Sequence, residues 1–259
     1  MEKIEQVSRD EMAVIAHLFR GWDETMIWSC LQGYMGDAWL DDPDYPRSAQ
    51  IVVGDFCFFA GVPHEGLALH IPADFSSKTI LFIPQHEGWE MLIERLYPHA
   101  ERFSRYALQK DRDAFHPETL AGYAASLPAG FTMRAIDEEL YHLTALEEWS
   151  QDLCSQFPTY DAYKERGMGF VVMRGAEPVC GASSYTVYKD GIEIEIDTKE
   201  SYRRQGLALA CAARLILACL ERGLYPSWDA ANTVSLHLAE KLGYRPAGEY
   251  AAYEVGISE

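Results

Sequence analysis

The most constraining feature of this chain is an alternating strand pattern that leads through a short loop into a helix. Residues 192–198 alternate apolar and polar side chains, which predicts a strand with one buried face. From Leu207 onward apolar residues recur at helical spacing until Gly223, a residue type that commonly ends helices. An apolar helix that directly follows such a strand packs against the sheet, so the pattern predicts a mixed α/β fold.

The loop between this strand and this helix has the composition of a pyrophosphate-binding site. It reads Arg203-Arg-Gln-Gly-Leu-Ala208. A helix N-terminus presents unpaired N–H groups and the positive end of the helix dipole to an anion. Gly206 lacks a Cβ and Ala208 is small, so a diphosphate can approach the backbone, and the two arginines add positive charge. The alternative interpretation is a solvent-exposed helix start without a ligand.

The rest of the second half predicts further strands and helices in alternation. Strands are expected at 131–136, 169–174, 178–187 and 224–228, with one or two closing strands within 244–255. Helices are expected from Asp137 and over 232–242, the second ending at Gly243. The resulting order β, α, ββ, β, α, β, α, ββ again indicates mixed α/β architecture.

The first half echoes the second at an offset of about 120 residues. Residues 51–61 and 170–181 each read as a strand, a tight turn and a strand that ends in glycine. Residues 79–83 lead to Gly88 and a helix, as 192–198 lead to Gly206. Two interpretations stay open: an internal duplication, or a coincidence between two α/β domains of similar size. A linker is expected at 126–130, which divides the chain into domains 1–128 and 129–259.

Charge and cysteine usage narrow the partners and the compartment. The formal net charge is −18, with acidic residues spread over both halves. A field of this sign repels nucleic-acid backbones, so we expect a cationic small-molecule partner and no nucleic acid. The six cysteines form no CxxC pair, and no apolar run has the length of a leader or a membrane span. We therefore expect a reduced cytoplasmic protein without a metal site and without membrane association.

Two segments of the second half together resemble the GNAT superfamily of acyl-CoA-dependent N-acyltransferases. The family's motif A is a strand followed by Q/R-x-x-G-x-G/A and a helix, which 194–208 matches. Its motif B typically reads N-x-x-S-x-x-L-Y-x-K-x-G-F, matched here by Asn232, Ser235, Leu238, Lys241 and Gly243. The resemblance covers about residues 131–255. The chain also resembles a bacterial subgroup of this family that carries an additional N-terminal region.

This resemblance implies a GNAT fold and an enzyme that takes its acetyl group from acetyl-CoA. By resemblance, the backbone of Ile196, Asp197 and Thr198 pairs with the pantetheine arm like an added strand. The amides of the loop hold the pyrophosphate, through Arg203, Arg204, Gln205, Gly206, Leu207 and Ala208. Asn232 and Ser235 lie along the other side of the pantetheine. Such enzymes usually transfer the acetyl group directly to a primary amine in a ternary complex, with a base for the amine and an acid for the thiolate.

Two departures from the family pattern leave the catalytic residues open. Ala239 replaces the motif B tyrosine that often protonates the thiolate, so Tyr244, Tyr185, a water or no group is left for this role, with Ser235 as another nearby hydroxyl. The central strand offers Glu193 and Glu195 on one face as bases, although the customary glutamate aligns one residue before Glu193. A β-bulge would restore the register, and we favour Glu195 over Glu193 as base or amine anchor. Plain surface alternation on an exposed sheet face is the alternative.

Two functional hypotheses follow from these patterns. The first is an enzyme that acetylates an amine, its N-terminal half walling the acceptor cleft or supplying a homodimer surface. The second is a non-catalytic acyl-CoA-binding or sensor module, which the missing motif B tyrosine favours. A longer acyl donor also stays open. If the first half is a degenerate copy, Glu90 takes the place of Ala208 and repels pyrophosphate, so one coenzyme site is expected.

Overall fold

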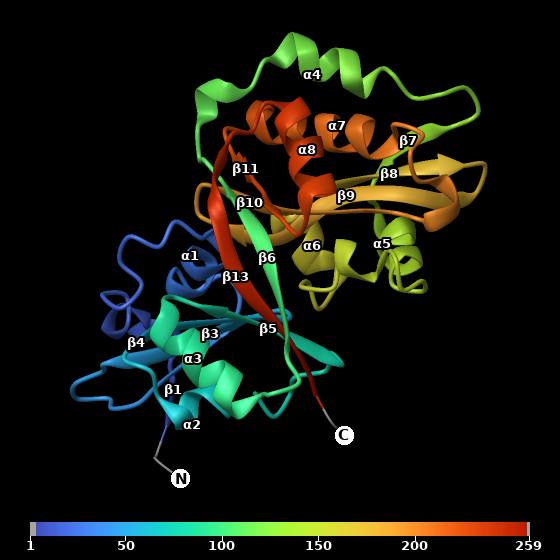
Figure 1. The fold of residues 1–259 in the computed structure, drawn as a ribbon. Helices are drawn as coiled ribbons and strands as arrows, with labels where there is room; N and C mark the ends of the chain where they lie inside the picture. The colour runs from blue at the N-terminus through green and yellow to red at the C-terminus, as the bar shows by residue number, and fades with distance from the viewer. Residues whose placement is uncertain (1–3, 258–259) are drawn as a thin grey trace. The chain divides into compact units, whose positions relative to one another are not determined.

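The structure is a computed structural model that describes residues 4–257. The chain divides into two compact units. The first contains the residues up to Arg105 together with those from Glu249 onward, and the second is Tyr106–Gly248. Each unit combines β-strands with helices packed against them (Figure 1).

The first unit is built on a mostly antiparallel sheet with an aromatic core. Its elements are β1 (Glu5–Val7), η1 (Arg9–Val14), α1 (Thr25–Leu31), β2 (Asp37–Leu40), β3 (Ser48–Val53), β4 (Phe56–Gly61), α2 (Glu65–Ala68), β5 (Thr79–Pro84), α3 (Glu87–Leu96) and β6 (Glu101–Leu108). The final strand, β13 (Pro246–Gly256), lies between β5 and β6. Phe59 stacks on Trp89 and meets Phe82 edge-on, both with 5.0 Å between ring centroids. All three side chains are fully buried, and aromatic burial of this extent is strongly stabilising.

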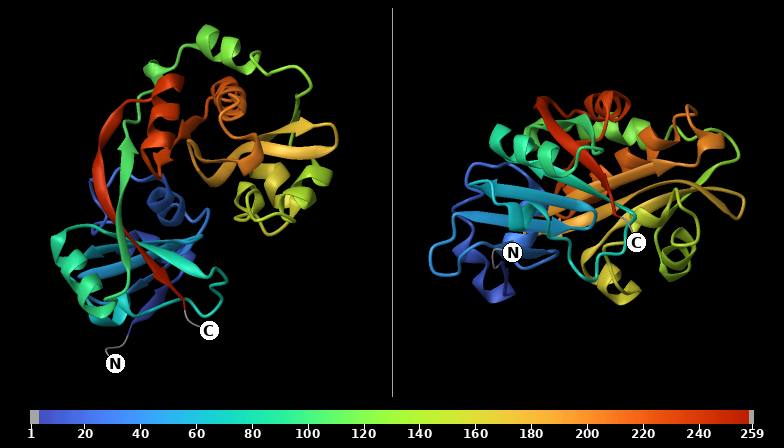
Figure 2. Two further views of the ribbon diagram at one scale, coloured as in Figure 1. Left: turned by 45° about the vertical axis from the view of Figure 1, so that its right-hand side comes forward. Right: turned by 60° about the horizontal axis from the view of Figure 1, so that its bottom comes forward.

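The second unit is a five-stranded sheet in the order β11-β10-β9-β8-β7. Its elements are η2 (Arg112–Ala114), α4 (Pro117–Ala124), β7 (Thr132–Ala135), α5 (Glu138–Thr144), η3 (Gln151–Leu153), α6 (Tyr160–Arg166), β8 (Gly169–Arg174), β9 (Glu177–Tyr188), β10 (Gly191–Thr198), η4 (Glu200–Tyr202), α7 (Leu207–Glu221), β11 (Tyr225–Ser227), β12 (Asp229–Ala230) and α8 (Thr233–Leu242). Helix α7 covers one face of the sheet, and α5 and α6 lie on the other (Figures 1 and 2). The predicted mixed α/β class is confirmed.

The compact units depart from the predicted boundary between 128 and 129 in two places. Residues 106–128 carry α4, which packs against α7 inside the second unit. Residues 249–256 of β13 belong to the first unit, where Tyr253–Gly256 pair antiparallel with β5. Both differences arise from packing between segments far apart in the chain, which composition and turn signals do not reveal.

Strand pairing corrects the equivalence drawn from the offset of about 120 residues. β4 and β5 are parallel, whereas β9 and β10 are antiparallel. The parallel pair of the second unit is β10 with β11. β5 therefore takes the topological place of β11, and its equivalence with β10 is wrong. The placement of Glu90 opposite Ala208 is wrong for the same reason, because it rested on that offset.

The helix boundaries confirm the caps predicted from the sequence. Helix α5 begins after Asp137, whose carboxylate accepts a first-turn N–H at 3.0 Å. Helix α8 begins after Asn232 and ends at Gly243, which has a φ of 112°. Helix α7 is followed by Gly223 with a φ of 71°. Glycine adopts these positive φ values without the steric cost that a Cβ adds.

Arg112 ties the segment before α4 to the sheet of the second unit. Its guanidinium donates to the carbonyls of Gly223 at 2.9 Å and Asp190 at 3.1 Å and lies 5.8 Å from the ring centroid of Tyr225. We expect Arg112→Ala to lower the free energy of unfolding by roughly 1 kcal/mol, because two charge-assisted hydrogen bonds are lost. Thermal denaturation measures this, with Arg166→Ala at the exposed end of α6 as control. Equal melting temperatures for the two variants would contradict the role.

Candidate active site

The two parallel strands of the second unit, β10 and the edge strand β11, pair over three residues and then separate. Residues 191–193 of β10 lie opposite 225–227 of β11. Beyond this point β10 stays paired with β9 up to Thr198, while β12 pairs with the end of β6. From Ile194 onward, the edge of β10 on the β11 side therefore has no strand partner among the described residues.

The backbone of Ile196 points to this open edge. In an antiparallel pair, alternate residues exchange both backbone hydrogen bonds with the neighbouring strand. The N–H of Lys199 donates to the Val179 carbonyl of β9 at 2.9 Å. By alternation Asp197 also bonds to β9, whereas Ile196 and Thr198 direct their N–H and C=O groups to the opposite side. An extended amide-containing chain can pair with a strand edge of this kind.

Thr198, by contrast, has its backbone groups engaged by neighbouring side chains. Its N–H donates to Asp197 Oδ1 at 2.6 Å, and its carbonyl accepts from Arg203 Nε at 3.0 Å. Arg203 Nη2 lies 3.5 Å from the same Asp197 oxygen. Ile196, Asp197 and Thr198 are the three strand residues expected along the pantetheine. Of these, Asp197 orients Arg203, the backbone groups of Thr198 are occupied, and Ile196 has backbone N–H and C=O groups directed to the open edge.

The predicted pyrophosphate loop forms a cradle, residues 203–208, at the start of α7. Gly206 is the N-cap with a φ of 79°, and no side chain caps the helix there. A Cβ built on Gly206 would meet no atom within 4 Å, so the space beside the first-turn N–H groups is open. Arg204 also has a left-handed backbone, with a φ of 61°. Strained backbone of this kind clusters at binding sites, and the arrangement suits a phosphate group.

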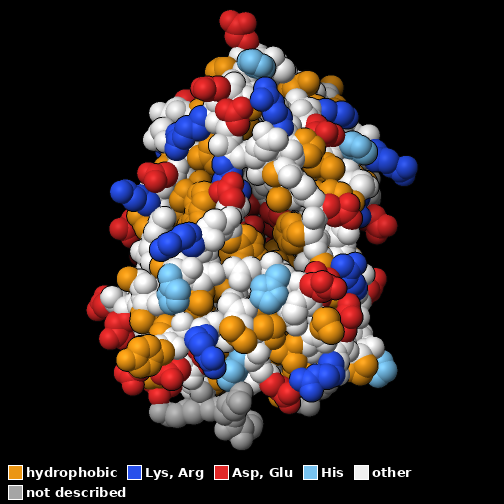
Figure 3. All heavy atoms as spheres, turned by 60° about the vertical axis from the view of Figure 1, so that its left-hand side comes forward, with side chains coloured by type: hydrophobic (Ala, Val, Ile, Leu, Met, Phe, Trp, Pro, Cys, Tyr) orange, Lys and Arg blue, Asp and Glu red, His pale blue; other side chains and the backbone are white. Residues whose placement is uncertain are grey.

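The cradle is a locally basic site in a strongly acidic chain. Arg203 and Arg204 are both exposed, while the chain carries a net charge of −18. On the face drawn in Figure 3, Lys and Arg side chains are interspersed with Asp and Glu. The net negative charge of the chain disfavours an extended polyanion as a ligand.

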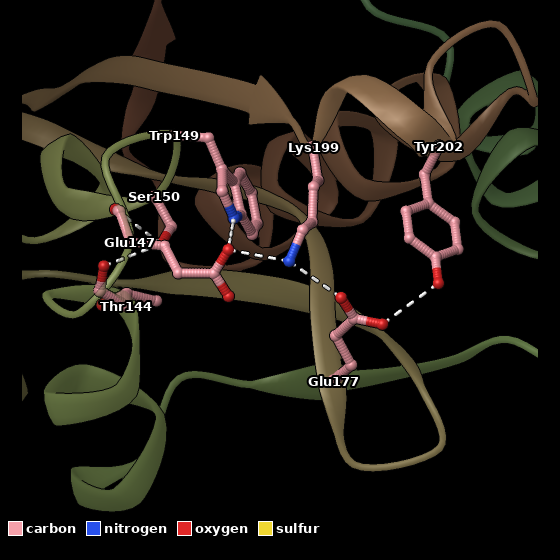
Figure 4. A network of polar contacts seen from close by, with 7 residues as sticks. All are labelled: Thr144, Glu147, Trp149, Ser150, Glu177, Lys199 and Tyr202. Atoms are coloured by element: carbon pink, nitrogen blue, oxygen red, sulfur yellow. Dashed lines mark hydrogen bonds and ion pairs between the residues drawn. The ribbon is translucent and has the colours of Figure 1, made fainter.

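A network of polar contacts holds the turn η4 that precedes the cradle (Figure 4). Lys199 Nζ contacts Glu147 Oε2 at 2.7 Å and Glu177 Oε1 at 2.8 Å, and the Tyr202 hydroxyl donates to Glu177 Oε2 at 3.0 Å. The hydrogen bonds that Lys199 donates to Glu147 and Glu177 raise the pKa of Lys199, and Lys199 in turn lowers the pKa of Glu177. The sequence interpretation missed this network, because its members are distant in the chain and show no shared pattern.

Breaking this network should loosen the cradle. We expect Lys199→Met to weaken acetyl-CoA affinity by about two- to five-fold, the range of partly exposed ion pairs. Isothermal titration measures the affinity, with Lys164→Met on the exposed surface of α6 as control. An unchanged dissociation constant would show that η4 does not position the cradle.

Asn232 and Ser235, predicted to line the pantetheine, lie at the start of α8. Asn232 Oδ1 accepts the N–H groups of Val234 and Ser235 at 3.0 Å each, so the side-chain oxygen serves as the cap. Its amide NH₂ remains the donor for a ligand. The Ser235 hydroxyl accepts from Trp228 Nε1 at 3.1 Å and keeps its own hydrogen for donation.

Tyr244, a candidate acid, is buried, and its hydroxyl already makes a hydrogen bond. Its hydroxyl donates to the Pro226 carbonyl, and its ring packs edge-on against Phe115 and Trp228. Burial raises the pKa of Tyr244 well above its ordinary value. The hydroxyl must leave Pro226 before it can protonate a thiolate, so the assignment of Tyr244 as acid stays a prediction. Ala239, at the motif B tyrosine position, is fully buried in α8.

The two candidate bases differ in burial and in neighbours. Glu193 and Glu195 share a face of β10 by alternation. Glu193 is buried, at 4% exposure, and Glu195 is half-buried. The β9–β10 ladder has a register irregularity between Glu193 and Ile194, where the pairing passes over Tyr185 of β9. It lies at the last residue of β10 that pairs with β11, so Glu193 marks the point where the strands separate.

The corresponding opening of the first unit is closed by its own side chains. After the parallel β4–β5 pair, Gln85 Oε1 accepts the Gly61 N–H at 3.0 Å, and Trp89 Nε1 donates to the Gly61 carbonyl at 2.9 Å. The Gln85 N–H donates to the Phe59 carbonyl at 3.0 Å. These bonds occupy the backbone groups that a pantetheine would need. A single coenzyme site, in the second unit, stays a prediction.

Residues 4–257 contain no cluster of three or more His, Cys, Asp or Glu side chains arranged to hold a metal ion. No helix in that range combines the length and apolarity needed to cross a membrane.

Comparisons with known proteins agree with this geometry. A family model described as GNAT acetyltransferase matches residues 16–253. The chain is 30% identical over 249 residues to the Bacillus subtilis (strain 168) protein named Uncharacterized N-acetyltransferase YdfB, with 90% of each chain covered. The structure of a GCN5-related N-acetyltransferase-like protein from Streptococcus suis 89/1591 matches with a TM-score of 0.90 at 45% identity, covering 95% of this chain and 99% of that chain.

A more distant structure shares the fold over the full length. A tandem GNAT protein from the clavulanic acid biosynthesis pathway matches with a TM-score of 0.57 at 13% identity, covering 99% of this chain and 100% of that chain. The family match extends from the first unit through the cradle and α8 into β13. This chain therefore belongs to the GNAT acetyltransferase family of acyl-CoA-dependent N-acetyltransferases.

Proposed function

We propose that this protein transfers an acetyl group from acetyl-CoA directly to a primary amine of a cationic small molecule, in a ternary complex. The observation that carries the proposal is the open backbone edge at Ile196 beside the cradle at Gly206. An extended arm that pairs with the strand and ends in a diphosphate fits this pair of features.

Different residues of the chain would bind the coenzyme and transfer the proton. Ile196 would pair with the pantetheine, Asn232 and Ser235 would donate to it, and the cradle would hold the pyrophosphate. Acetyl-CoA, when bound, supplies the acetyl thioester. A glutamate at the strand separation accepts a proton from the acceptor's ammonium group, which frees the nitrogen lone pair for attack.

The charge of the site supports a cationic acceptor. Glu193, Glu195 and Asp197 lie on one face of β10, and the whole chain is strongly acidic. A negative field raises the local concentration of cationic amines and their rate of association. The six free, buried cysteines suit a reducing compartment, and we propose the cytoplasm.

A second candidate function is acyl-CoA binding without chemistry. The Tyr244 hydroxyl is committed to a carbonyl, and Ala239 stands where the family often has a tyrosine. Under this alternative the coenzyme site is intact, but the thiolate has no side chain to protonate it.

A panel of amines with thiol detection separates the two functions. The panel contains polyamines, aminoglycosides, amino acids and a lysine peptide, each incubated with acetyl-CoA and the protein. We expect release of free coenzyme A with at least one cationic amine and a product one acetyl group heavier by mass spectrometry. Tight acetyl-CoA binding without turnover of any amine would support the binding module instead.

A further inference from the structure

Arg203, the first residue of the cradle, has its side chain turned back onto the end of β10. Its Nε donates to the Thr198 carbonyl at 3.0 Å, and its Nη2 lies 3.5 Å from Asp197 Oδ1. The same Asp197 oxygen accepts the Thr198 N–H at 2.6 Å. We call these contacts the Asp197–Arg203 clasp. Together they occupy both backbone groups of Thr198, the last residue of the strand.

The backbone of Arg203 is also engaged, unlike that of the residues after it. Its N–H donates to the Glu200 carbonyl at 3.2 Å and closes the turn η4. In the described part of the chain, the N–H groups of residues 204–206 have no backbone acceptor, and those of the first turn of α7 have none within the helix. The backbone donors that a phosphate can use therefore begin at Arg204.

Arg204 differs from Arg203 although the two are adjacent in the sequence. Its side chain is exposed and makes no hydrogen bond or ion pair with any residue that the structure describes. The charge of Arg203 is partly balanced by Asp197, whereas that of Arg204 is not. A carboxylate beside a guanidinium weakens the attraction of that guanidinium for a second anion. Of the two arginines, Arg204 is therefore the one whose charge is available to a ligand.

We propose that Arg203 is a positioning residue that fixes the end of β10 and is not a ligand of the pyrophosphate. This inference rests on the proposed function and deepens it. Because the Thr198 carbonyl is occupied, an extended arm pairs with the strand at Ile196 and then turns to the cradle. The phosphates meet the amides from Arg204 onward and the Arg204 guanidinium. Loss of the clasp leaves the strand end free to move and changes the direction in which the arm departs.

Two ligands separate a role at the strand end from a phosphate contact. Acetyl-CoA carries both the pantetheine arm and the diphosphate, whereas S-acetylpantetheine carries the arm alone. A residue that positions the strand affects both ligands by the same factor, because both pair with Ile196. A residue that contacts phosphate affects acetyl-CoA only. The ratio of the two dissociation constants therefore distinguishes the two roles.

The experiment measures both dissociation constants at one ionic strength, by isothermal titration for acetyl-CoA and by NMR titration for the weaker S-acetylpantetheine. We expect Arg203→Met to weaken both ligands by the same factor, about two- to ten-fold, the range of one net hydrogen bond. Arg204→Met, the matched control, should weaken acetyl-CoA by about ten-fold and leave S-acetylpantetheine unchanged. A loss confined to acetyl-CoA in Arg203→Met, or no loss with either ligand, would overturn the proposal.

Arg203→Lys separates the charge of this residue from its hydrogen-bond geometry. Lysine keeps the positive charge but lacks the Nε donor and the planar fork of arginine. We therefore expect Arg203→Lys to weaken both ligands as Arg203→Met does. Wild-type affinity in Arg203→Lys would show that charge alone matters and would contradict the positioning role. Far-UV circular dichroism checks that each variant is folded.

A measurement on the ligand-free protein keeps this inference separate from the proposed function. A carbonyl that loses a hydrogen bond changes its ¹³C chemical shift. The carbonyl signal of Thr198 should therefore move in Arg203→Met and Arg203→Lys and keep its position in Arg204→Met. An unmoved Thr198 signal in both Arg203 variants would overturn the proposal, whatever the affinities. A wild-type protein that binds no acetyl-CoA would contradict the proposed function, and the Thr198 signal would still test the role of Arg203 at the strand end.

Discussion

Gly206→Glu should abolish measurable acetyl-CoA binding. The substitution places a carboxylate beside the first-turn N–H groups of α7, where the pyrophosphate is proposed to lie. At roughly 4 Å between like charges, the repulsion amounts to several kcal/mol at intermediate dielectric, and each 1.4 kcal/mol is about ten-fold in affinity. We expect a loss of at least about a hundred-fold in isothermal titration, against one site per chain in the wild type.

The matched control for this variant is Gly175→Glu. Gly175 lies in the turn between β8 and β9 with a φ of 64°, close to the 79° of Gly206, and a Cβ there also meets nothing within 4 Å. The two substitutions therefore share backbone strain of about 1–2 kcal/mol and added charge, and they differ only in place. Equal acetyl-CoA affinity of the two variants would exclude the cradle as the pyrophosphate site.

Glu193→Gln is expected to have the second large effect, on turnover. An amide cannot accept the ammonium proton, and loss of a general base typically lowers kcat by about a hundred- to ten-thousand-fold. The amide has nearly the same shape as the carboxylate, so acetyl-CoA affinity should be unchanged. Initial rates with a saturating amine from the panel measure this effect.

Glu195→Gln is the partner variant for this prediction. Glu195 is less buried and lies beside a serine committed elsewhere, so we expect a smaller loss that falls mainly on the KM of the amine. The reverse result, with turnover lost in Glu195→Gln and retained in Glu193→Gln, would favour the assignment made from the sequence and contradict the structural one.

Several parts of the site could be predicted because their signals act over a few residues. Alternation of apolar and polar side chains marks β10, and Gly206 marks the loop before α7. Asn232 and Gly243 bracket α8 at the predicted positions. Capping, glycine conformation and strand alternation are local properties of the backbone, and the structure confirms these elements.

Other parts of the fold and the site could not be predicted from neighbouring residues. The parallel pairing of β4 with β5 contradicts the strand equivalence that the offset of about 120 residues implied. Strand β13 pairs with β5, although Tyr253 and its partner Phe82 lie far apart in the sequence. The contacts of Lys199 with Glu147 and Glu177 bring together three segments. Long-range pairing depends on packing of the whole chain, so spacing along the sequence does not predict it. The division at residue 128 and the homodimer surface stay predictions.

Short motifs predicted the family, the α/β class and the loop before α7, because each of these signals depends on a few neighbouring residues. The two glutamates differ in burial, since Glu193 is buried and Glu195 half-buried, and that difference comes from the pairing of β10 with its neighbours. Register across β9, β10 and β11 sets Thr186 and Ser227 beside Glu193, and that register depends on a bulge in the ladder. One residue of slip reverses which face each side chain occupies. The surroundings of each β10 side chain therefore depend on the pairing of β10 with β9 and β11 as much as on the sequence of β10 itself.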